Sequence, residues 1–441
     1  MPIARPSRSP DREPEPDGAA EAGARPDAGQ DHGPTTARPA PSRQSLRGLD
    51  WFIFFLADVQ TGFGPFIAVY LTTQKWTQAQ IGLVLSIGGI VGLIGQMPGG
   101  AIIDAARSER RVAGLAIATI GCCALAYAAW PIFPVVAGAA TFHAAASCVL
   151  GPAIAAISLG LVGPRGMAER LGRNARFASL GNGVAAAVMG TCGYLLSSRA
   201  VFLVTFILAF PTLIALSRIR EREIDVARAH GQADHEDKEV ARLSNLLGLL
   251  RQRALLVFAL GVFLLQLANA AMLPLMAGVV TTKSSEWAPM LIAFCIVVPQ
   301  AIVALTSPSV GAVAQQWGRR PLLMLGFAAL ATRGALFAVV HDPYVLVAVQ
   351  IFDGVTAAVF AVMIPLTVAD VAFGSGHFNL AQGIVGTASG IGGSLSTVVA
   401  GFASDRYGSA TAFMGLSGVA LTGLLLIALL MPETGQRERR A

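Results

Sequence analysis

The sequence predicts an all-α integral membrane protein with twelve transmembrane helices in two pseudo-symmetric six-helix bundles. Three observations lead to this fold class. Of the 441 residues, 54% are hydrophobic and only 13% are charged, whereas a soluble globular chain carries roughly 25% charged residues. Twelve apolar stretches each approach the about 20 helical residues that cross a bilayer. The last six stretches also repeat features of the first six.

The apolar stretches divide the chain into five parts. Residues 1–46 are rich in Pro, Ala, Arg and Asp and have no apolar run like that of a signal peptide. This composition predicts a disordered cytoplasmic tail. A misassigned start codon is the alternative explanation. A first bundle (47–217), a cytoplasmic central loop (218–253), a second bundle (254–434) and a short cytoplasmic tail (435–441) follow. The predicted spans lie near 51–72, 81–103, 112–130, 133–162, 177–198, 200–217, 254–280, 288–312, 320–340, 343–370, 382–404 and 410–431.

The distribution of basic residues predicts the orientation of these spans. On the side that holds the N-terminus lie 27 of the 32 Lys and Arg residues, and only four lie on the opposite side. Because cytoplasmic loops of membrane proteins are enriched in Lys and Arg, both termini and the central loop are expected in the cytoplasm, with the chain integral to the plasma or inner membrane. The net charge of +6 is explained in this way and indicates no nucleic-acid partner.

The two halves resemble each other in sequence. The first span carries Gln60 followed by Pro65, and the seventh carries Asn269 followed by Pro274 at the same offset. Glycines of the fifth and eleventh spans, such as Gly181 and Gly386, predict close packing between the halves. Parallel repeats of six spans are a known architecture of membrane transporters.

Two short loops, one in each half, carry a glycine, a polar residue four positions later and a basic pair. The glycine lets two helices approach closely. The acid of the first loop can cap the next helix or pair with the basic residues. Such loops predict a latch that holds one conformation and breaks in another. The first loop carries Gly100, Asp104, Arg110 and Arg111, and the second carries Gly311, Gln315, Gly318, Arg319 and Arg320.

With these loops, residues 48–434 resemble the major facilitator superfamily, whose loop motif is Gly-x-x-x-Asp-Arg/Lys-x-Gly-Arg/Lys-Arg/Lys. The second loop has Gln315 in place of the acid, and the first places its basic pair two residues late and lacks the inner glycine. The resemblance implies two bundles around a central cavity that opens alternately to each side. It also implies that the first, fourth, seventh and tenth helices line this cavity.

Polar residues inside these four spans agree with that arrangement. Such groups are costly in a bilayer and usually face a cavity or a partner, so they are expected either to line a path for substrate and protons or to satisfy contacts between helices. Asp58 is the first candidate for proton coupling and Asp353 the second, while His143 is expected to relay a proton, bind substrate or remain a buried hydrogen-bonded imidazole. The predicted path residues are Asp58, Gln60, His143, Gln266, Asn269, Gln350 and Asp353.

Arg333 is the one basic residue within a span. It is expected either to pair with an acid elsewhere in the fold or to extend its side chain outward past Val340. In the central loop, His230, His235 and Glu236 are compatible with a metal site, but a solvated loop is the preferred interpretation.

The function predicted from these observations is secondary active transport of a small solute by a monomer, with proton coupling and either direction of transport open. An organic cation, a zwitterion or a metal chelate fits the polar residues as substrate. A membrane-embedded enzyme is disfavoured because no catalytic or nucleotide-binding motif occurs, and neither a cofactor nor a metal is expected. The alternative is a non-transporting sensor or partner platform on a transporter fold.

Overall fold

The computed structural model describes residues 41–61, 67, 70, 71, 73–230, 252–276, 288–340 and 342–434. Every regular element in these ranges is a helix, so the predicted all-α fold class is confirmed. Ten described helices are long and apolar enough to cross a membrane. The longest of them contains both the fourth and the fifth predicted spans.

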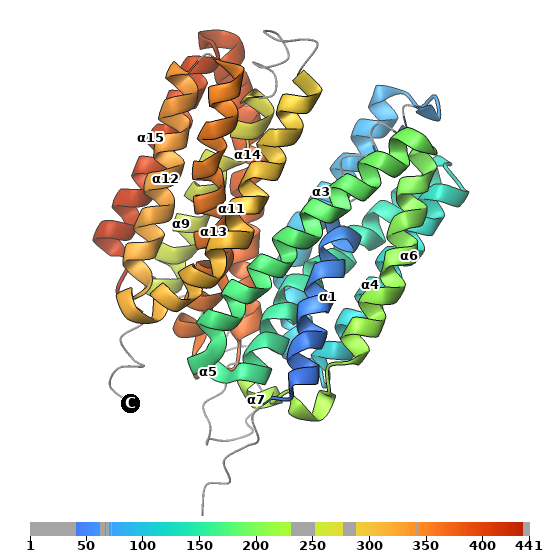
Figure 1. Cartoon of the computed structure of the whole chain (residues 1–441), viewed down its shortest axis with the longest axis vertical. Coiled ribbons are helices and arrows are strands. Elements are labelled where there is room, and N and C mark those ends of the chain that lie inside the picture. The colour runs from blue at the N-terminus through green and yellow to red at the C-terminus, as the bar shows by residue number, and fades with distance from the viewer. Residues whose placement is uncertain are drawn as a thin grey trace, which may run out of the picture. The chain divides into compact units, whose positions relative to one another are not determined.

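The helices of the first half begin at residues that suit a helix N-terminus. Thr77 and Gln80 form a capping box in which each side chain accepts from the other's backbone N–H. Ser108 accepts from the backbone N–H of Arg111 at the start of the following helix. The long helices of this half are α1 (Arg43–Thr61), α3 (Gln78–Asp104), α4 (Glu109–Ala129), α5 (Phe133–Leu195) and α6 (Ser198–Ser217) (Figure 1).

The 63-residue helix α5 is broken once, at Gly163. This glycine has φ 67° and ψ 177°, a backbone conformation that residues with a Cβ atom rarely adopt. Pro164 follows at the first turn of the next segment, where its missing N–H is tolerated. The expected loop from 163 to 176 is therefore wrong, because the chain is helical again directly after Gly163.

Two further expectations about segment boundaries are corrected. Residues 43–46, expected in the N-terminal tail, form the first turn of α1, which begins at Arg43. The described part of the central loop is folded rather than solvated: it contains η1 (Glu221–Glu223) and α7 (Val226–Ala229), and Ile219, Ala229 and His230 are buried. His235 and Glu236 lie outside the described residues.

The second half repeats the pattern of long helices. Its helices are α9 (Arg253–Asn269), α11 (Ala288–Trp317), α12 (Arg319–Val339), α13 (Pro343–Ala372), α14 (Phe378–Tyr407) and α15 (Ser409–Leu430). Asp342 caps α13 by accepting from the backbone N–H groups of Tyr344 and Val345.

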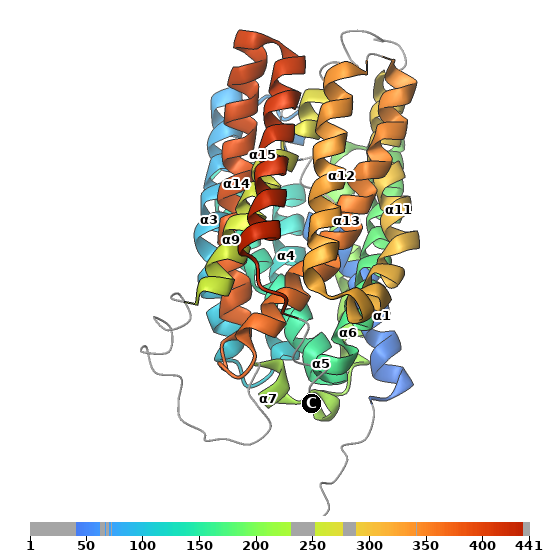
Figure 2. The ribbon, with the colours of Figure 1, turned by 90° about the vertical axis from the view of Figure 1, so that its left-hand side faces the viewer.

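Each half has its own hydrophobic core. One cluster of buried residues lies within the first half, and the other lies in the second half and extends onto the middle of α5. Helix α5 contacts α11 and α13, and α3 runs beside α14 (Figures 1 and 2). The two halves therefore meet mainly where α3 lies against α14 and where α5 lies against α11 and α13.

Candidate functional site

Arg333 on α12 is the centre of a buried polar cluster in the second half. Its Nη1 donates to Asn269 Oδ1 on α9 at 2.7 Å and to Asp353 Oδ1 on α13 at 2.6 Å. The guanidinium also lies 5.3 Å from the ring centroid of Phe337. Because its side chain is only 1% exposed, Arg333 does not extend outward past Val340, and the acid that it pairs with is Asp353.

The ion pair combines a fixed charge with a variable one. A guanidinium stays protonated in proteins, whereas a carboxylate can bind a proton. The side chain of Asp353 is 21% exposed, whereas that of Arg333 is 1% exposed. An arrangement of this kind can exchange a proton or an anionic group at the carboxylate position without moving the cation.

The other predicted path residues of the second half lie on the same helices as this cluster. Gln266, one turn before Asn269, donates from Nε2 to Ser389 Oγ on α14 at 3.0 Å. Gln350, one turn before Asp353, is fully buried next to the thiol of Cys295. The structure thus connects Asn269 and Asp353 through Arg333, and it places Gln266 at the contact between α9 and α14.

His143 lies in a cavity of the first half. The cavity has a volume of about 370 Å³ and is lined mainly by residues of α3, α4 and α5, including Gln96, Ser147 and Cys148. Gln96 donates to the sulfur of Cys148 at 3.7 Å. The two remaining predicted path residues, Asp58 and Gln60, are on α1, but their side chains lie outside the described residues.

Asp104 joins the two halves at the contact of α3 with α14. Its Oδ1 accepts from Asn379 Nδ2 at 2.8 Å and from the Asn379 backbone N–H at 3.2 Å, and its Oδ2 accepts from the Leu380 backbone N–H at 2.7 Å. Asp104 therefore caps the N-terminus of α14, where a carboxylate is favoured by the helix dipole. The expectation that it caps the next helix is wrong, because Ser108 caps α4.

Glycines allow the close approach of α3 to α14. A Cβ at Gly100 would lie 2.1 Å from the carbonyl oxygen of Asn379, and one at Gly383 would lie 2.4 Å from that of Gln96. The predicted role of the eleventh-span glycines between the halves is thus confirmed for Gly383. The same prediction is wrong for Gly181, which packs against the carbonyl of Phe54 within the first half.

The second loop makes the equivalent contact between α11 and α5. A Cβ at Gly311 would lie 2.3 Å from the carbonyl oxygen of Ala168. Gln315, at the position of the missing acid, donates from Nε2 to the carbonyl of Arg165 at 3.1 Å. Ser307 on α11 also donates to the carbonyl of Gly172 on α5 at 3.0 Å. Among the described residues this contact therefore contains two neutral hydrogen bonds, where the α3–α14 contact contains three hydrogen bonds to a carboxylate.

The basic residues of the first loop contact their own half. Arg110 donates to the carbonyl of Ile219 at 2.6 Å, and Glu221 lies 3.9 Å from Arg110 and 3.8 Å from Arg111. These contacts attach the loop to the segment that follows α6.

The basic residues of the second loop are fixed by two acids. Arg319 pairs with Asp370 at 2.8 Å. The backbone N–H groups of Arg319 and Arg320 donate to the carboxylate of Glu433 at 2.6 and 3.1 Å. Gly318 has φ 89°, and a Cβ there would lie 2.7 Å from this carboxylate. Glu433 therefore caps α12 from the segment after α15.

Sequence reasoning missed the buried ion cluster at the start of α1. Asp50 pairs with Arg170 and Arg173 on α5, each at 2.6 Å, and the carboxylate is only 2% exposed. Arg170 also donates to Asn174 at 2.6 Å. The spacing of Arg170, Arg173 and Asn174 on one helix face was the available signal, and it was obscured because this segment was expected to be a loop.

The segment after α6 also reaches the second half. The backbone N–H of Phe378 donates to the carbonyl of His230 at 3.3 Å, and Asn379 donates to that of Ala229 at the same distance. His230 itself lies 3.2 Å from Glu109 on α4. Among the residues that the structure describes, no group of three His, Cys, Asp or Glu side chains is arranged to hold a metal ion.

Two helical halves that meet through equivalent loop contacts have the arrangement of a two-bundle membrane transporter. The sequence matches the family model described as Major Facilitator Superfamily over residues 51–303 and again over 258–441. The chain therefore belongs to the major facilitator superfamily, a family of transporters and not of enzymes, and it is an integral membrane protein with multiple spans.

Known relatives agree with this assignment. Two proteins from strains of Mycobacterium tuberculosis, each named an uncharacterized MFS-type transporter, are 38% identical over 394 residues, which cover 88% of this chain and 93% of the relative. The crystal structure of the human organic anion transporter MFSD10 (TETRAN) matches 88% of this chain and 100% of that chain with a TM-score of 0.67 at 14% identity. The latter similarity shows the fold alone.

Proposed function

We propose that the protein is a monomeric, proton-coupled secondary transporter that moves a small solute by alternating access, with Arg333 and Asp353 as its coupling pair. The observation that carries this proposal is the buried guanidinium of Arg333 held between Asp353 and Asn269. Asn269 and Asp353 lie on α9 and α13, the seventh and tenth spans, which are cavity-lining helices in the family resemblance.

Coupling follows from the energetics of a buried charge. Removing one partner of a buried ion pair is strongly unfavourable because the other charge is left uncompensated. When Asp353 binds a proton, Arg333 keeps its charge and needs another acceptor. A solute with a carboxylate or a strong hydrogen-bond acceptor supplies one, so proton binding to Asp353 and solute binding near Arg333 favour each other.

A zwitterion or an organic acid fits this scheme better than a simple organic cation, since the buried partner of the solute is positive. The human protein with a similar fold, MFSD10, is an organic anion transporter. Gln266 and Gln350 are proposed to offer hydrogen bonds along the same side of the path once the helices around them move. Asp58, Gln60 and His143 are proposed to line the opposite wall, with Asp58 as a second proton-binding carboxylate.

The loop contacts are proposed to act as latches at the cytoplasmic end. Asp104 with α14 and Gln315 with α5 hold the halves together in the present conformation. In the orientation indicated by the basic residues, this conformation is closed toward the cytoplasm in the plasma or inner membrane. Solute release on that side then requires both contacts to break.

Transport is tested in proteoliposomes with an imposed pH gradient. The vesicles are exposed to a mixed panel of small organic acids, zwitterions and cations, and mass spectrometry identifies what accumulates. We expect uptake of an acceptor-bearing solute that collapses when the gradient is removed with a proton carrier. Asp353→Asn should abolish gradient-driven uptake while retaining exchange of solute across the membrane.

The matched control is Asp342→Asn, which removes an exposed helix-capping carboxylate at the start of the same helix. It should leave gradient-driven uptake intact. Equal gradient-driven uptake by wild type and Asp353→Asn would refute the coupling pair, and the same comparison for Asp58→Asn tests the second carboxylate.

The orientation of the chain in the membrane is tested separately with cysteines introduced at Arg107 and Arg406, which are both exposed. Arg107 lies in the loop between α3 and α4, and Arg406 lies at the end of α14. In intact cells, a membrane-impermeant thiol reagent should label only the cysteine at position 406. Labelling of position 107 alone would reverse the proposed topology.

A further inference from the structure

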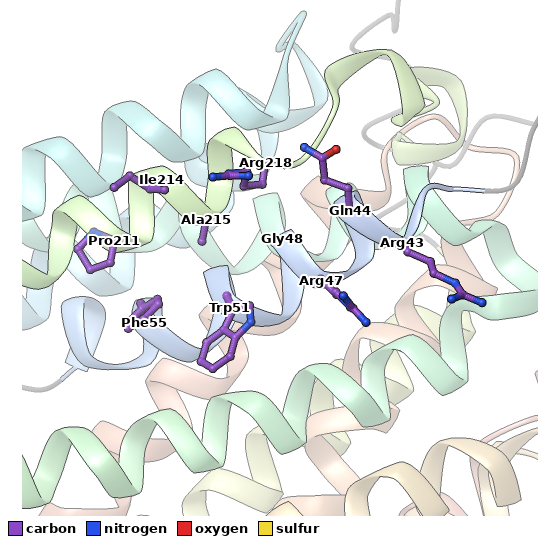
Figure 3. Close-up of a pocket in the computed structure, with 10 residues that line it drawn as sticks. All are labelled: Arg43, Gln44, Arg47, Gly48, Trp51, Phe55, Pro211, Ile214, Ala215 and Arg218. Carbon is purple, nitrogen blue, oxygen red and sulfur yellow. The ribbon is translucent and has the colours of Figure 1, made fainter.

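A groove of about 770 Å³ lies between α1 and α6 at the end of the first half where α1 begins (Figure 3). Along α1 it is lined at four-residue intervals by Arg43, Arg47, Trp51 and Phe55, which share one helix face. Along α6 it is lined by Pro211, Ile214, Ala215 and Arg218. Both walls are therefore basic at one end and apolar along the rest of their length.

The basic end of the groove carries three arginines and no acid, and Arg43 and Arg47 also line a neighbouring pocket on the α5 side, which contains Glu169. Among the described residues, the guanidinium groups of Arg43, Arg47 and Arg218 make no ion pair or hydrogen bond, and no carboxylate lines the groove. The N-terminus of α1 is already occupied by the carboxylate of Glu223, which accepts from the backbone N–H of Ser42, so the site depends on the arginine side chains. An anion is thus favoured at this position by three side chains.

The acids nearby in the sequence have other partners. Glu223 accepts from the backbone N–H and the hydroxyl of Ser42, both at 2.9 Å, and from Arg220 at 3.3 Å. Arg220 also donates to Gln44 at 3.0 Å. These bonds fix the first turn of α1 against the segment after α6, so the arginines of the groove are held in place without being neutralised.

The apolar part of the groove is open to the surroundings of the bundle. Trp51 is 50% exposed and Ile214 is 59% exposed. Trp51 is positioned by ring contacts with Phe55 at 5.9 Å and Phe177 at 6.3 Å. At Gly48 the two helices come close, because a Cβ there would lie 3.1 Å from Cβ of Arg218. In an integral membrane protein, such a surface faces lipid.

We propose that this groove binds one anionic phospholipid. Its phosphate-bearing headgroup lies among the three arginines, and an acyl chain follows the apolar walls past Trp51 toward Phe55. A phospholipid is the occupant that combines both chemistries, since its anionic and apolar parts are joined at the boundary between headgroup and hydrocarbon, where basic pockets between helices recognise lipid headgroups. In the proposed orientation the site lies in the cytoplasmic leaflet.

The proposal is tested with the full chain purified in a neutral detergent. Phosphatidylglycerol and phosphatidylcholine with identical acyl chains are titrated separately, and bound lipid is counted by native mass spectrometry while thermal unfolding is followed in parallel. We expect one tightly retained phosphatidylglycerol and a raised unfolding temperature, and neither effect with phosphatidylcholine.

The test variant is Arg43→Gln/Arg47→Gln/Arg218→Gln. Each basic residue near an anionic lipid contributes about fivefold in affinity, so the triple variant should bind phosphatidylglycerol roughly 100-fold more weakly. The matched control is Arg107→Gln/Arg176→Gln/Arg222→Gln, which removes three exposed arginines outside the groove. It should bind like wild type.

A further variant, Trp51→Ala, separates the two parts of the site by weakening lipid retention with the three arginines intact. Inorganic phosphate is the last arm and should not raise the unfolding temperature. Full stabilisation by phosphate alone would assign the site to a free anion and overturn the proposal. Equal phosphatidylglycerol binding by the two triple variants would also overturn it.

Discussion

The carboxylate of Asp104 lies 2.7 Å from the backbone nitrogen of Leu380, so a loop of the first half caps a helix of the second. A helix cap contributes about 1 kcal/mol. Here that contribution exists only while the two halves are together, because the acceptor and the donors belong to different halves. The cap therefore adds to the free energy difference between conformations and not only to the stability of α14.

Asp104→Ala should shift the protein toward the conformation in which this end is open. The loss of about 1 kcal/mol changes the ratio of two conformations roughly fivefold. Spin labels at Arg107 and Phe373, which are exposed in opposite halves at this end, report the change as a longer component in the distance distribution.

The control for this measurement is Asp342→Ala. Asp342 caps α13 within the second half, so its loss should lower the unfolding temperature without altering the distance between the labels. An unchanged distribution in Asp104→Ala would show that the cap does not bias the conformational equilibrium.

Gly100→Ala and Gly311→Ala should push the two halves apart, because each new methyl group clashes with the backbone of the other half. The new Cβ atoms would meet backbone carbonyl oxygens at 2.1 and 2.3 Å, and backbone cannot yield as a flexible side chain does. Each variant is expected to lengthen the same label distance and to reduce transport.

The matched controls are Gly138→Ala and Gly401→Ala, where no atom lies within 4 Å of the new Cβ. Since alanine favours a helix over glycine by about 1 kcal/mol, these variants should be as stable as wild type or more stable. A similar loss of transport in all four variants would contradict the steric explanation.

Arg333→Met should be among the most destabilising single substitutions in the second half. It leaves the carboxylate of Asp353 without its partner, and breaking a buried pair in this way costs about 3–5 kcal/mol. Adding Asp353→Asn to Arg333→Met should recover part of the loss in unfolding temperature. Strictly additive losses in the double variant would show that the two side chains do not stabilise each other.

The contact of Glu223 with the first turn of α1 should depend on pH. Burial raises the pKa of Glu223, but hydrogen bonds from Ser42, Ser45 and Arg220 outweigh this effect and bring the pKa below its usual value. The resulting stability is present above the pKa of the unfolded chain, about 4.3 for Glu, and is lost as the pH falls through the lower pKa of the folded state.

Glu223→Gln therefore should lose stability less steeply than wild type when the pH is lowered through this range. Thermal unfolding at a series of pH values from 6 downward measures the difference. Parallel curves for the two proteins would exclude Glu223 as a contributor to acid sensitivity.

Much of the fold was predictable because lipid imposes simple requirements on sequence. Span length, apolar content and the spacing of glycine and proline are local properties, and they located α3, α4 and α11 to α15 within a few residues. The break at Gly163 was not predictable in the same way. The charges of Arg165, Arg170 and Arg173 suggested a loop, whereas on the helix Asp50 forms ion pairs with two of them.

The candidate site was predictable as a set of residue types but not as a set of contacts. Asn269 and Asp353 stand out as polar groups in apolar spans. Their connection through Arg333 depends on how α9, α12 and α13 pack, and no local pattern encodes that packing. The cap that Glu433 supplies was unpredictable for the same reason, since it joins α12 to a segment more than a hundred positions later.

The difference between Asp104 and Gln315 has a mechanical consequence. A carboxylate with three donors resists separation more strongly than an amide with a single acceptor. The side of α5 and α11 is joined by two neutral hydrogen bonds, from Gln315 and Ser307, so we expect strain that pulls the halves apart to open this side first, with the side of α3 and α14 as the pivot. The opening motion is then an asymmetric rotation of one half against the other, although the architecture of the two halves is nearly symmetric.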